Sequence, residues 1–213
     1  MIHIIKHKEF NNPVPEGYQE IGVGPMFKDT TDNINHLNPV INELTGIYDV
    51  WKNQNDEIVG FCHYHRFFTE VDKILTLDRA EELLEDYEII LANRVVYRNE
   101  FLYNTLANDF REDLSTYGKY MSMLLSDNVL KLHFMQNTFH PRNMFICSRE
   151  ILDQYCEWLF SKIIPVAEAF LANDYNRYPH YYNRMIGFIA ERFLTCWVKY
   201  VDLKYIELPY EET

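Results

Sequence analysis

The stretch IVGFCHYHRFF, residues 58–68, is the part of the chain from which the rest can be interpreted. It begins as an apolar run behind a polar turn, which predicts a buried β-strand. The run then gives way to two imidazoles and a guanidinium. Because residues alternate faces along a strand, we expect His63 and His65 to point one way and Tyr64 and Arg66 the other. A buried strand with such an end is typical of a ligand site at the carboxyl edge of an α/β sheet, although a strand end in a solvated loop would look similar.

Length, composition and charge restrict the class of protein. The 213 residues are 47% hydrophobic and 15% aromatic, which predicts a single compact domain over residues 1–213. The chain has 32 acidic and 20 basic residues, and the resulting net charge of −12 disfavours nucleic acid as a partner. Affinity for nucleic acid comes mainly from Lys and Arg at phosphates. A small phosphorylated ligand needs only a local positive pocket and is still compatible with this charge.

Cysteine usage and hydropathy indicate a cellular compartment. The four cysteines lie inside apolar runs without a CxxC pair, as expected for buried side chains in a reduced protein. No apolar run reaches membrane-spanning length, and the N-terminus lacks the apolar region of a signal peptide. We therefore expect a cytoplasmic protein, for which peripheral contact with the inner membrane is an open alternative.

Predicted strands and helices alternate through most of the chain. Apolar, β-branched runs predict strands at residues 2–5, 18–23, 58–62, 88–92, 143–147 and 205–208. Amphipathic segments predict helices at residues 40–52, 77–87, 149–172 and 184–200, and helical pieces within 97–123. This alternation predicts an α/β fold: a Rossmann-like three-layer sandwich with a mostly parallel central sheet and a helical C-terminal half.

Polar residues follow several of the predicted strands. Ligand sites in such folds gather where parallel strands end. This rule brings together residues 6–8, residues 63–66 and the pair Asn93-Arg94, and the segment around Asn143 is a further candidate. The agreement between separate strands favours a functional site over a solvated loop.

Several separated segments share the order and spacing of one protein family. They are residues 5–8, 32–35, 38–39, 43–45, 51–53, 60–66, 143–146 and 187–194. In this order the chain resembles, over nearly its full length, the DUF4422 family of bacterial polysaccharide-biosynthesis glycosyltransferases. The most specific segments are CHYHR at residues 62–66 and GFIAER at residues 187–192. The family usually has Arg where this chain has His65.

The resemblance implies an activity and its substrates. It implies a GT-A-like glycosyltransferase, hexosyl- or galactofuranosyltransferase-like, with a nucleotide-diphosphate donor such as a UDP-sugar. The acceptor would be a glycan or lipid-linked oligosaccharide of capsule, exopolysaccharide or O-antigen assembly. In such a fold the first strand ends near the nucleotide, which makes His7 and Lys8 candidate base or phosphate contacts. Tyr64, His65 and Arg94 are further candidates for donor binding.

Two arrangements of the central motif are compatible with this chemistry. Metal-dependent GT-A enzymes usually place Asp-x-Asp at this position to hold Mn²⁺ or Mg²⁺, and the chain has no acidic pair there. Arg66 and a protonated His63 could neutralise the leaving diphosphate directly, so we favour a metal-free site and keep Mn²⁺ or Mg²⁺ as an open alternative. Alternatively, His63, His65 and a carboxylate such as Asp32 could bind a transition metal, as in a metal-dependent hydrolase. A non-catalytic glycan or nucleotide-sugar binding module is a third possibility.

The remaining candidate residues each have two interpretations. Glu191 could act as the catalytic base or contact an acceptor hydroxyl, or it could form a structural ion pair with Arg192 or Arg184. The resemblance suggests Arg192 and Asn143 as acceptor contacts, although Asn143 could equally be a turn residue. Three residues of the polar loop could bind ribose or sugar hydroxyls, or shape the loop through Asx turns: Asp32, Asn33 and Asn38.

Overall fold

A mixed, mostly parallel sheet forms the centre of the protein. The computed structural model describes residues 1–10, 13–126, 128–176 and 180–212. The central path of the sheet has the order β10-β6-β9-β3-β1-β2. Its strands are β1 (Ile2–Lys6), β2 (Tyr18–Gly22), β3 (Ile58–His63), β6 (Ile89–Ala92), β9 (Phe145–Ser148) and β10 (Tyr205–Leu208). Only β9 runs against the others on this path, since it pairs antiparallel with both β3 and β6.

Residues 63–66 were expected to alternate between the two faces of one continuous strand. The structure has a β-hairpin there instead. β3 ends at His63, and β4 (Arg66–Glu70) returns antiparallel, with His63 opposite Arg66. Tyr64 and His65 form the turn between them. The prediction that His63 and His65 face away from Tyr64 and Arg66 is therefore wrong. A turn does not follow strand alternation, and all four residues line one cavity. β4 also pairs with β5 (Lys73–Ile74) and β11 (Tyr210–Glu212).

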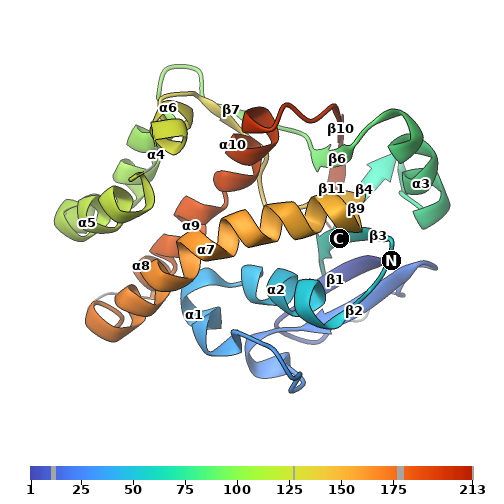
Figure 1. Ribbon diagram of the computed structural model, residues 1–213, viewed down its shortest axis with the longest axis horizontal. Helices are drawn as coiled ribbons and strands as arrows, with labels where there is room; N and C mark the ends of the chain where they lie inside the picture. Colours follow the sequence, from blue (N-terminus) through green and yellow to red (C-terminus); the bar gives the residue numbers. More distant parts are fainter. Residues whose placement is uncertain (11–12, 127, 177–179, 213) are drawn as a thin grey trace.

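Helices cover both faces of the sheet, which confirms the three-layer sandwich. Ile89 and Leu91 of β6 belong to one hydrophobic cluster and Ile90 to another, as strand alternation requires. The first cluster lies under α2 (Leu44–Asn53), α7 (Arg149–Asn173) and α10 (Phe193–Tyr200). The second lies under α3 (Leu77–Asp86). Figure 1 shows α7 crossing the molecule and α3 set apart from it at the other end of the view.

Each of two predicted helices is divided into two shorter helices in the structure. The predicted helix at residues 40–52 is α1 (Asn38–Ile41) followed by α2, because Asn42 has φ 48° and interrupts the helical backbone. The predicted helix at 184–200 is α9 (Met185–Ala190) followed by α10. Between them lie Glu191 and Arg192, which makes this break part of the site's construction.

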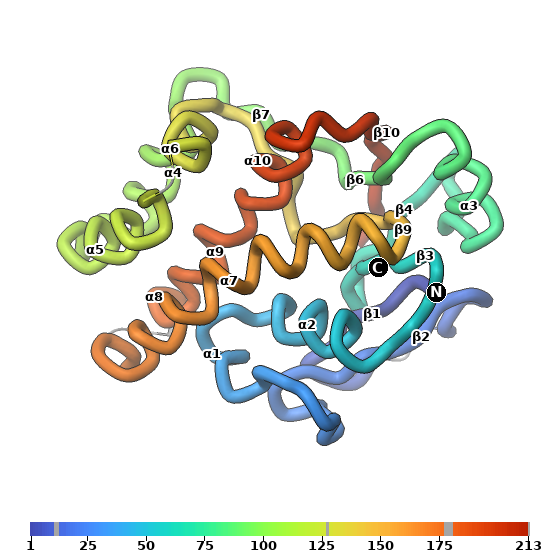
Figure 2. Tube along the Cα trace, in the orientation of Figure 1, coloured from blue at the N-terminus to red at the C-terminus, as the bar shows by residue number. Residues whose placement is uncertain are grey.

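A group of short helices extends from the sheet. It contains α4 (Leu102–Asp109), η3 (Arg111–Asp113), α5 (Leu114–Leu124) and α6 (Asn128–Phe134). Its base is the two-stranded ladder of β7 (Val95–Val96) and β8 (Thr138–Phe139). The tube in Figure 2 shows this excursion leaving after β6 and returning before β9. The remaining short helices are η1 (Gly24–Met26), η2 (Asn35–Leu37) and α8 (His180–Asn183). Among the described residues, no helix combines the length and apolar character needed to cross a membrane.

Candidate active site

A cavity of about 670 Å³ opens at the carboxyl edge of the parallel strands. Its walls come from the ends of β1 and β3, from α1 and the start of α2, and from the segment that contains α8 and α9. His63 lies beside Ile5 in the register of β3 and β1, so both strands deliver their last residues to the same place. The rule that parallel strands end at a common ligand site therefore locates this cavity.

The direction of β9 brings a further segment to the same edge. Because β9 is antiparallel, the residues that precede it, Arg142 and Asn143, lie where the other strands end. Both residues have left-handed backbone angles, with φ 73° and 52°. Residues other than glycine adopt this region at a cost of about 1–2 kcal/mol each. Two such residues in succession at a cavity wall indicate that the surrounding contacts hold the turn in place.

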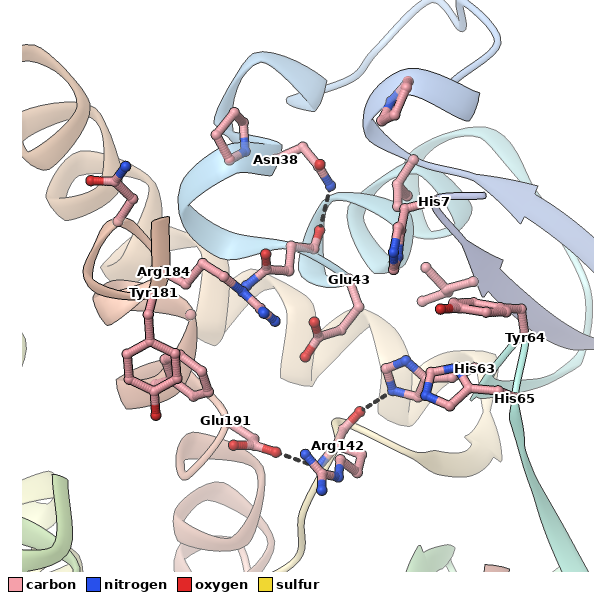
Figure 3. Close-up of a pocket in the computed structure, with 18 of the residues that line it drawn as sticks. His7, Asn38, Glu43, His63, Tyr64, His65, Arg142, Tyr181, Arg184 and Glu191 are labelled. Atoms are coloured by element: carbon pink, nitrogen blue, oxygen red, sulfur yellow. Dashed lines mark hydrogen bonds between the residues drawn. The ribbon is translucent and has the colours of Figure 1, made fainter. Parts of the chain in front are cut away.

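Hydrogen bonds from two directions hold the Arg142 backbone. The Arg142 amide donates to Oε1 of Glu191 at 2.6 Å. Nε2 of His63 lies 2.7 Å from the Arg142 carbonyl, as Figure 3 shows. A carbonyl can only accept, so Nε2 carries the hydrogen and Nδ1 of the neutral ring has the lone pair. Glu191 and His63 thus fix the cavity wall from the two sides of one residue.

The imidazoles of the cavity are neutral at pH 7. Burial lowers the pKa of His63 to about 4 and that of His65 to about 4, and it also lowers the pKa of His7. The neighbouring guanidinium of Arg66 adds to the lowering at His63 and His65. Desolvation thus disfavours the protonated His63 that was expected to supply positive charge.

Arginines supply the positive charge. Arg66, Arg142 and Arg184 line the cavity. Arg66 pairs with Glu212 at 2.6 Å, and this carboxylate is 58% exposed. Within the described ranges, no carboxylate forms an ion pair with Arg142 or Arg184, and the Arg142 Nε atom is buried without a hydrogen-bond partner. Guanidinium groups that no carboxylate pairs with directly are suited to binding an anion in the cavity.

Glu43 is a second acidic group in the cavity. Its side chain is half-buried, and Oε1 accepts a hydrogen bond from Nδ2 of Asn143 at 2.8 Å. Burial raises the pKa of the Glu43 carboxyl, while the Asn143 hydrogen bond and the charges of Arg184 and Arg142 oppose that rise. Asn143 itself is 2% exposed and does not line the cavity, so its amide supports Glu43 from behind the lining and offers no direct contact to an acceptor there.

Glu191 makes the contacts of a structural ion pair. Its Oε2 lies 2.6 Å from Nη1 of Arg192, and its Oε1 accepts from the Arg142 amide. Arg192 is 4% exposed and lies over the ring of Phe139, with 4.1 Å from its Cζ to the ring centroid. Arg192 does not line the cavity. Of the two interpretations that the sequence left open for Glu191, these contacts match the ion pair.

Part of the predicted donor site lies in the cavity. His7, Asn38, Tyr64 and His65 line it. The His7 and Tyr64 rings meet edge to face with 5.2 Å between their centroids. Lys8 lies over the outer side of Tyr64, 5.4 Å from the ring centroid, and is outside the lining.

Three predicted donor residues lie elsewhere. Asp32 accepts a hydrogen bond from the Tyr48 hydroxyl at 3.0 Å. The Asn33 side chain accepts from the Asn35 amide, which is the Asx turn that was its alternative interpretation. Arg94 pairs with Glu207 at 3.0 Å. Because none of them lines the cavity, the geometry gives them no contact with a ligand there.

The alternative metal centre does not form. The described part of the chain contains no group of three His, Cys, Asp or Glu side chains that could hold a metal ion. Nε2 of His63 is used by the Arg142 carbonyl, and Asp32 is bonded to Tyr48. The predicted metal site of His63, His65 and Asp32 is therefore wrong, because the three side chains do not come together.

Several residues of the cavity received no site role from the sequence, among them Glu43, Arg142, Tyr181 and Arg184. Glu43 lay within a matched motif but carried no role, and Arg142 stood next to the candidate Asn143. Their contribution depends on the turn before β9 and on the break between α8 and α9, neither of which has a local sequence signal. The aromatic Tyr181 is 46% exposed at the cavity.

Comparison with known proteins agrees with this architecture. A family model described as a domain of unknown function, DUF4422, matches residues 1–202. No curated protein matches the sequence. The apo structure of the bifunctional glycosyltransferase WbbM has a similar fold, with a TM-score of 0.81 and 22% sequence identity. The similarity covers 100% of this chain and 45% of that one, so the chain spans less than half the length of this relative. With the match extending over most of its length, the chain belongs to the DUF4422 family.

Proposed function

We propose that the protein is a glycosyltransferase that moves a sugar from a nucleotide-diphosphate donor to a glycan hydroxyl. The fold is shared with a glycosyltransferase, which supports a transferase at a coarse level. A UDP-sugar donor and an acceptor from capsule, exopolysaccharide or O-antigen assembly are the finer parts of this proposal, and they follow from the family resemblance. A lipid-linked acceptor would bring the protein into peripheral contact with the inner membrane.

The observation that carries the proposal is the charge of the cavity. Arg142 and Arg184 line a space of about 670 Å³ without a carboxylate partner among the described residues, and Arg66 lies beside them. This volume is within the range of cavities that enclose small ligands and cofactors. A diphosphate leaving group develops negative charge as the glycosidic bond breaks, and fixed guanidinium groups stabilise that charge. Tyr64 and His7 offer an aromatic surface at the end of β1 that suits a nucleobase or a sugar ring.

A thermal-shift screen tests the proposal. The purified protein would be melted with UDP-, GDP- and dTDP-sugars and the free diphosphates, each with Mn²⁺ and with EDTA. We expect one nucleotide sugar to raise the melting temperature in EDTA as well as in Mn²⁺. Arg184→Ala should remove that shift, whereas Arg111→Ala, an exposed arginine on η3, should keep it.

Turnover separates the transferase from the binding module. A donor that binds should also be consumed, which is measured as release of its nucleoside diphosphate. Binding without release, with water and with a panel of octyl glycosides as acceptors, would favour the non-catalytic module. No shift with any nucleotide would contradict the proposal.

A further inference from the structure

We propose that Glu43 is the general base that accepts the proton of the attacking hydroxyl, with Asn143 as its positioning residue. This inference rests on the proposed function and assigns the chemical step within the same cavity. Transfer to an acceptor requires a group that takes up a proton as the hydroxyl oxygen attacks the anomeric carbon. The cavity contains two carboxylates and three imidazoles that could do so.

Glu191 is engaged on both oxygens. Oε1 accepts from the Arg142 amide at 2.6 Å and Oε2 from Nη1 of Arg192 at 2.6 Å. Both oxygens therefore already accept from a donor, and taking up the proton of a hydroxyl would break one of these hydrogen bonds. Moving Glu191 would also release the left-handed turn at Arg142. These contacts indicate that Glu191 holds the Arg142 segment of the cavity wall in place.

His63 and His65 are poor bases for this step. Nε2 of His63 donates to the Arg142 carbonyl, and burial keeps the pKa of this ring at about 4. The pKa of His65 is also held at about 4 by burial and by Arg66. A base with such a pKa gains little by taking a proton from a hydroxyl near neutral pH.

Glu43 has the geometry that the step requires. Asn143 donates to Oε1 at 2.8 Å, which fixes the carboxyl orientation. Asn143 cannot relax easily, since it is 2% exposed and sits at φ 52°. In Figure 3 the Glu43 carboxyl reaches into the space between Arg184 and Arg142. The Glu43 carboxyl therefore lines the same cavity as the two arginines proposed to stabilise the leaving diphosphate.

The environment of Glu43 also suits proton transfer. Burial raises the pKa of its carboxyl from the ordinary value, which moves it towards neutral pH. Asn143 and the two arginines oppose that rise, because they favour the ionised carboxylate. A general base is most effective under these opposing influences, since it must be deprotonated and yet retain proton affinity.

The reaction balances with these residues. The acceptor oxygen forms a bond to the anomeric carbon, and its proton moves to the Glu43 carboxylate. The bond between the anomeric carbon and the diphosphate oxygen breaks, and its electron pair leaves with the nucleoside diphosphate. Arg142 and Arg184 stabilise the added charge on that leaving group. A single displacement of this kind inverts the anomeric centre.

Glu43→Gln is the decisive variant. Its amide oxygen can still accept from Asn143, so the site should keep its shape and the donor-induced thermal shift of the wild type. Release of nucleoside diphosphate, with water and with octyl glycosides as acceptors, should fall by about 100- to 10,000-fold. The matched control is Glu157→Gln, an exposed residue on α7, which should retain the wild-type rate.

A pH profile tests the positioning role of Asn143. Asn143→Gly is compatible with the left-handed backbone and removes the hydrogen bond that favours the Glu43 carboxylate. We expect the acidic limb of kcat/KM against pH to move upward, with the donor-induced shift retained. A loss of stability alone would lower activity without moving this limb.

The outcomes separate the two proposals. The assignment of Glu43 as the base is overturned if Glu43→Gln binds the donor and turns over at the wild-type rate, or if the product retains the anomeric configuration. Either result leaves the proposed transferase activity unaffected. A wild-type protein that shows no donor-induced shift, or binds a donor without turnover, overturns both. The assignment is supported if Glu43→Gln still binds the donor but loses turnover and the wild-type protein inverts the anomeric centre.

Discussion

Replacing Arg142 with glycine should make the protein more stable and less able to bind its donor. Arg142 has φ 73°, where glycine carries no steric penalty, so the substitution relieves about 1–2 kcal/mol of backbone strain. It also removes the buried Nε atom that lacks a partner, which costs about 1 kcal/mol or more in the wild type. The greater freedom of glycine in the unfolded chain opposes these gains by about 0.4–1 kcal/mol.

The remaining contacts of residue 142 survive the change. The hydrogen bonds to Glu191 and His63 use the backbone amide and carbonyl, which glycine retains. Loss of the contacts of the arginine stem reduces the gain further, and the net expectation is about 1 kcal/mol of added stability. For a chain of this length, that corresponds to a rise in melting temperature of roughly 2–4 °C.

Calorimetry of the ligand-free protein and a donor-induced thermal shift measure the two effects separately. Arg142→Ala is the matched control, because it removes the same guanidinium but keeps a Cβ in the left-handed region. Both variants should lose most of the donor-induced shift, and only Arg142→Gly should melt above the wild type. An Arg142→Gly protein that melts below both Arg142→Ala and the wild type would refute the claim that strain is stored at this turn.

Other predictions test the core and the helix contacts that support the site. Burial lowers the pKa of His133 to about 4, below the unfolded value of 6.5, so the unfolded chain takes up this proton first and stability falls as pH drops from about 6.5 to about 4. His133→Gln should flatten the pH dependence of the free energy of unfolding by up to about 1.4 kcal/mol per pH unit in that window, as measured by urea titration. A Cβ on Gly187 would lie 3.1 Å from the Val40 carbonyl and 3.0 Å from Nδ2 of Asn42, so Gly187→Ala should lower the free energy of unfolding by about 1–3 kcal/mol. Gly118→Ala, whose Cβ meets open space in α5, should raise it by about 0.5–1 kcal/mol, and equal effects of the two changes would contradict the packing of α9 on α1.

The fold was largely predictable because its strands carry strong local signals. The apolar runs that begin at Ile2, Ile58 and Ile89 are buried strands, and the Ser148 side chain caps α7. The breaks were less predictable, since Asn42 leaves the helical region within a segment whose apolar spacing continues into α2. A periodic pattern reports which face is buried, and it does not show where a backbone turns between two helices that share that face.

The site was predictable where it follows strand ends and, for Asn38 and Glu191, where the family resemblance named the residue. His7 and residues 63–66 lie in the cavity because parallel strands end together, which the alternation of elements already implied. The direction of β9 is a tertiary property, however, and it decides that Arg142 and Asn143 reach the same edge. Glu43 is held by a hydrogen bond from Asn143, which is one hundred residues away in the sequence, so no local pattern could connect the two residues.

The turn at Arg142 and Asn143 links the stability of the protein to its proposed chemistry. Glu191 and His63 hold the backbone of Arg142, whose side chain lines the cavity, while the buried Asn143 holds Glu43, which lines the same cavity. A relaxed turn built from glycines would be compatible with the same fold but would present neither a guanidinium nor an amide. Strained residues persist in native proteins only where neighbouring contacts determine them. The buried ion pair of Glu191 with Arg192 is then explained by the turn that it supports, because it anchors the carboxylate that receives the Arg142 amide.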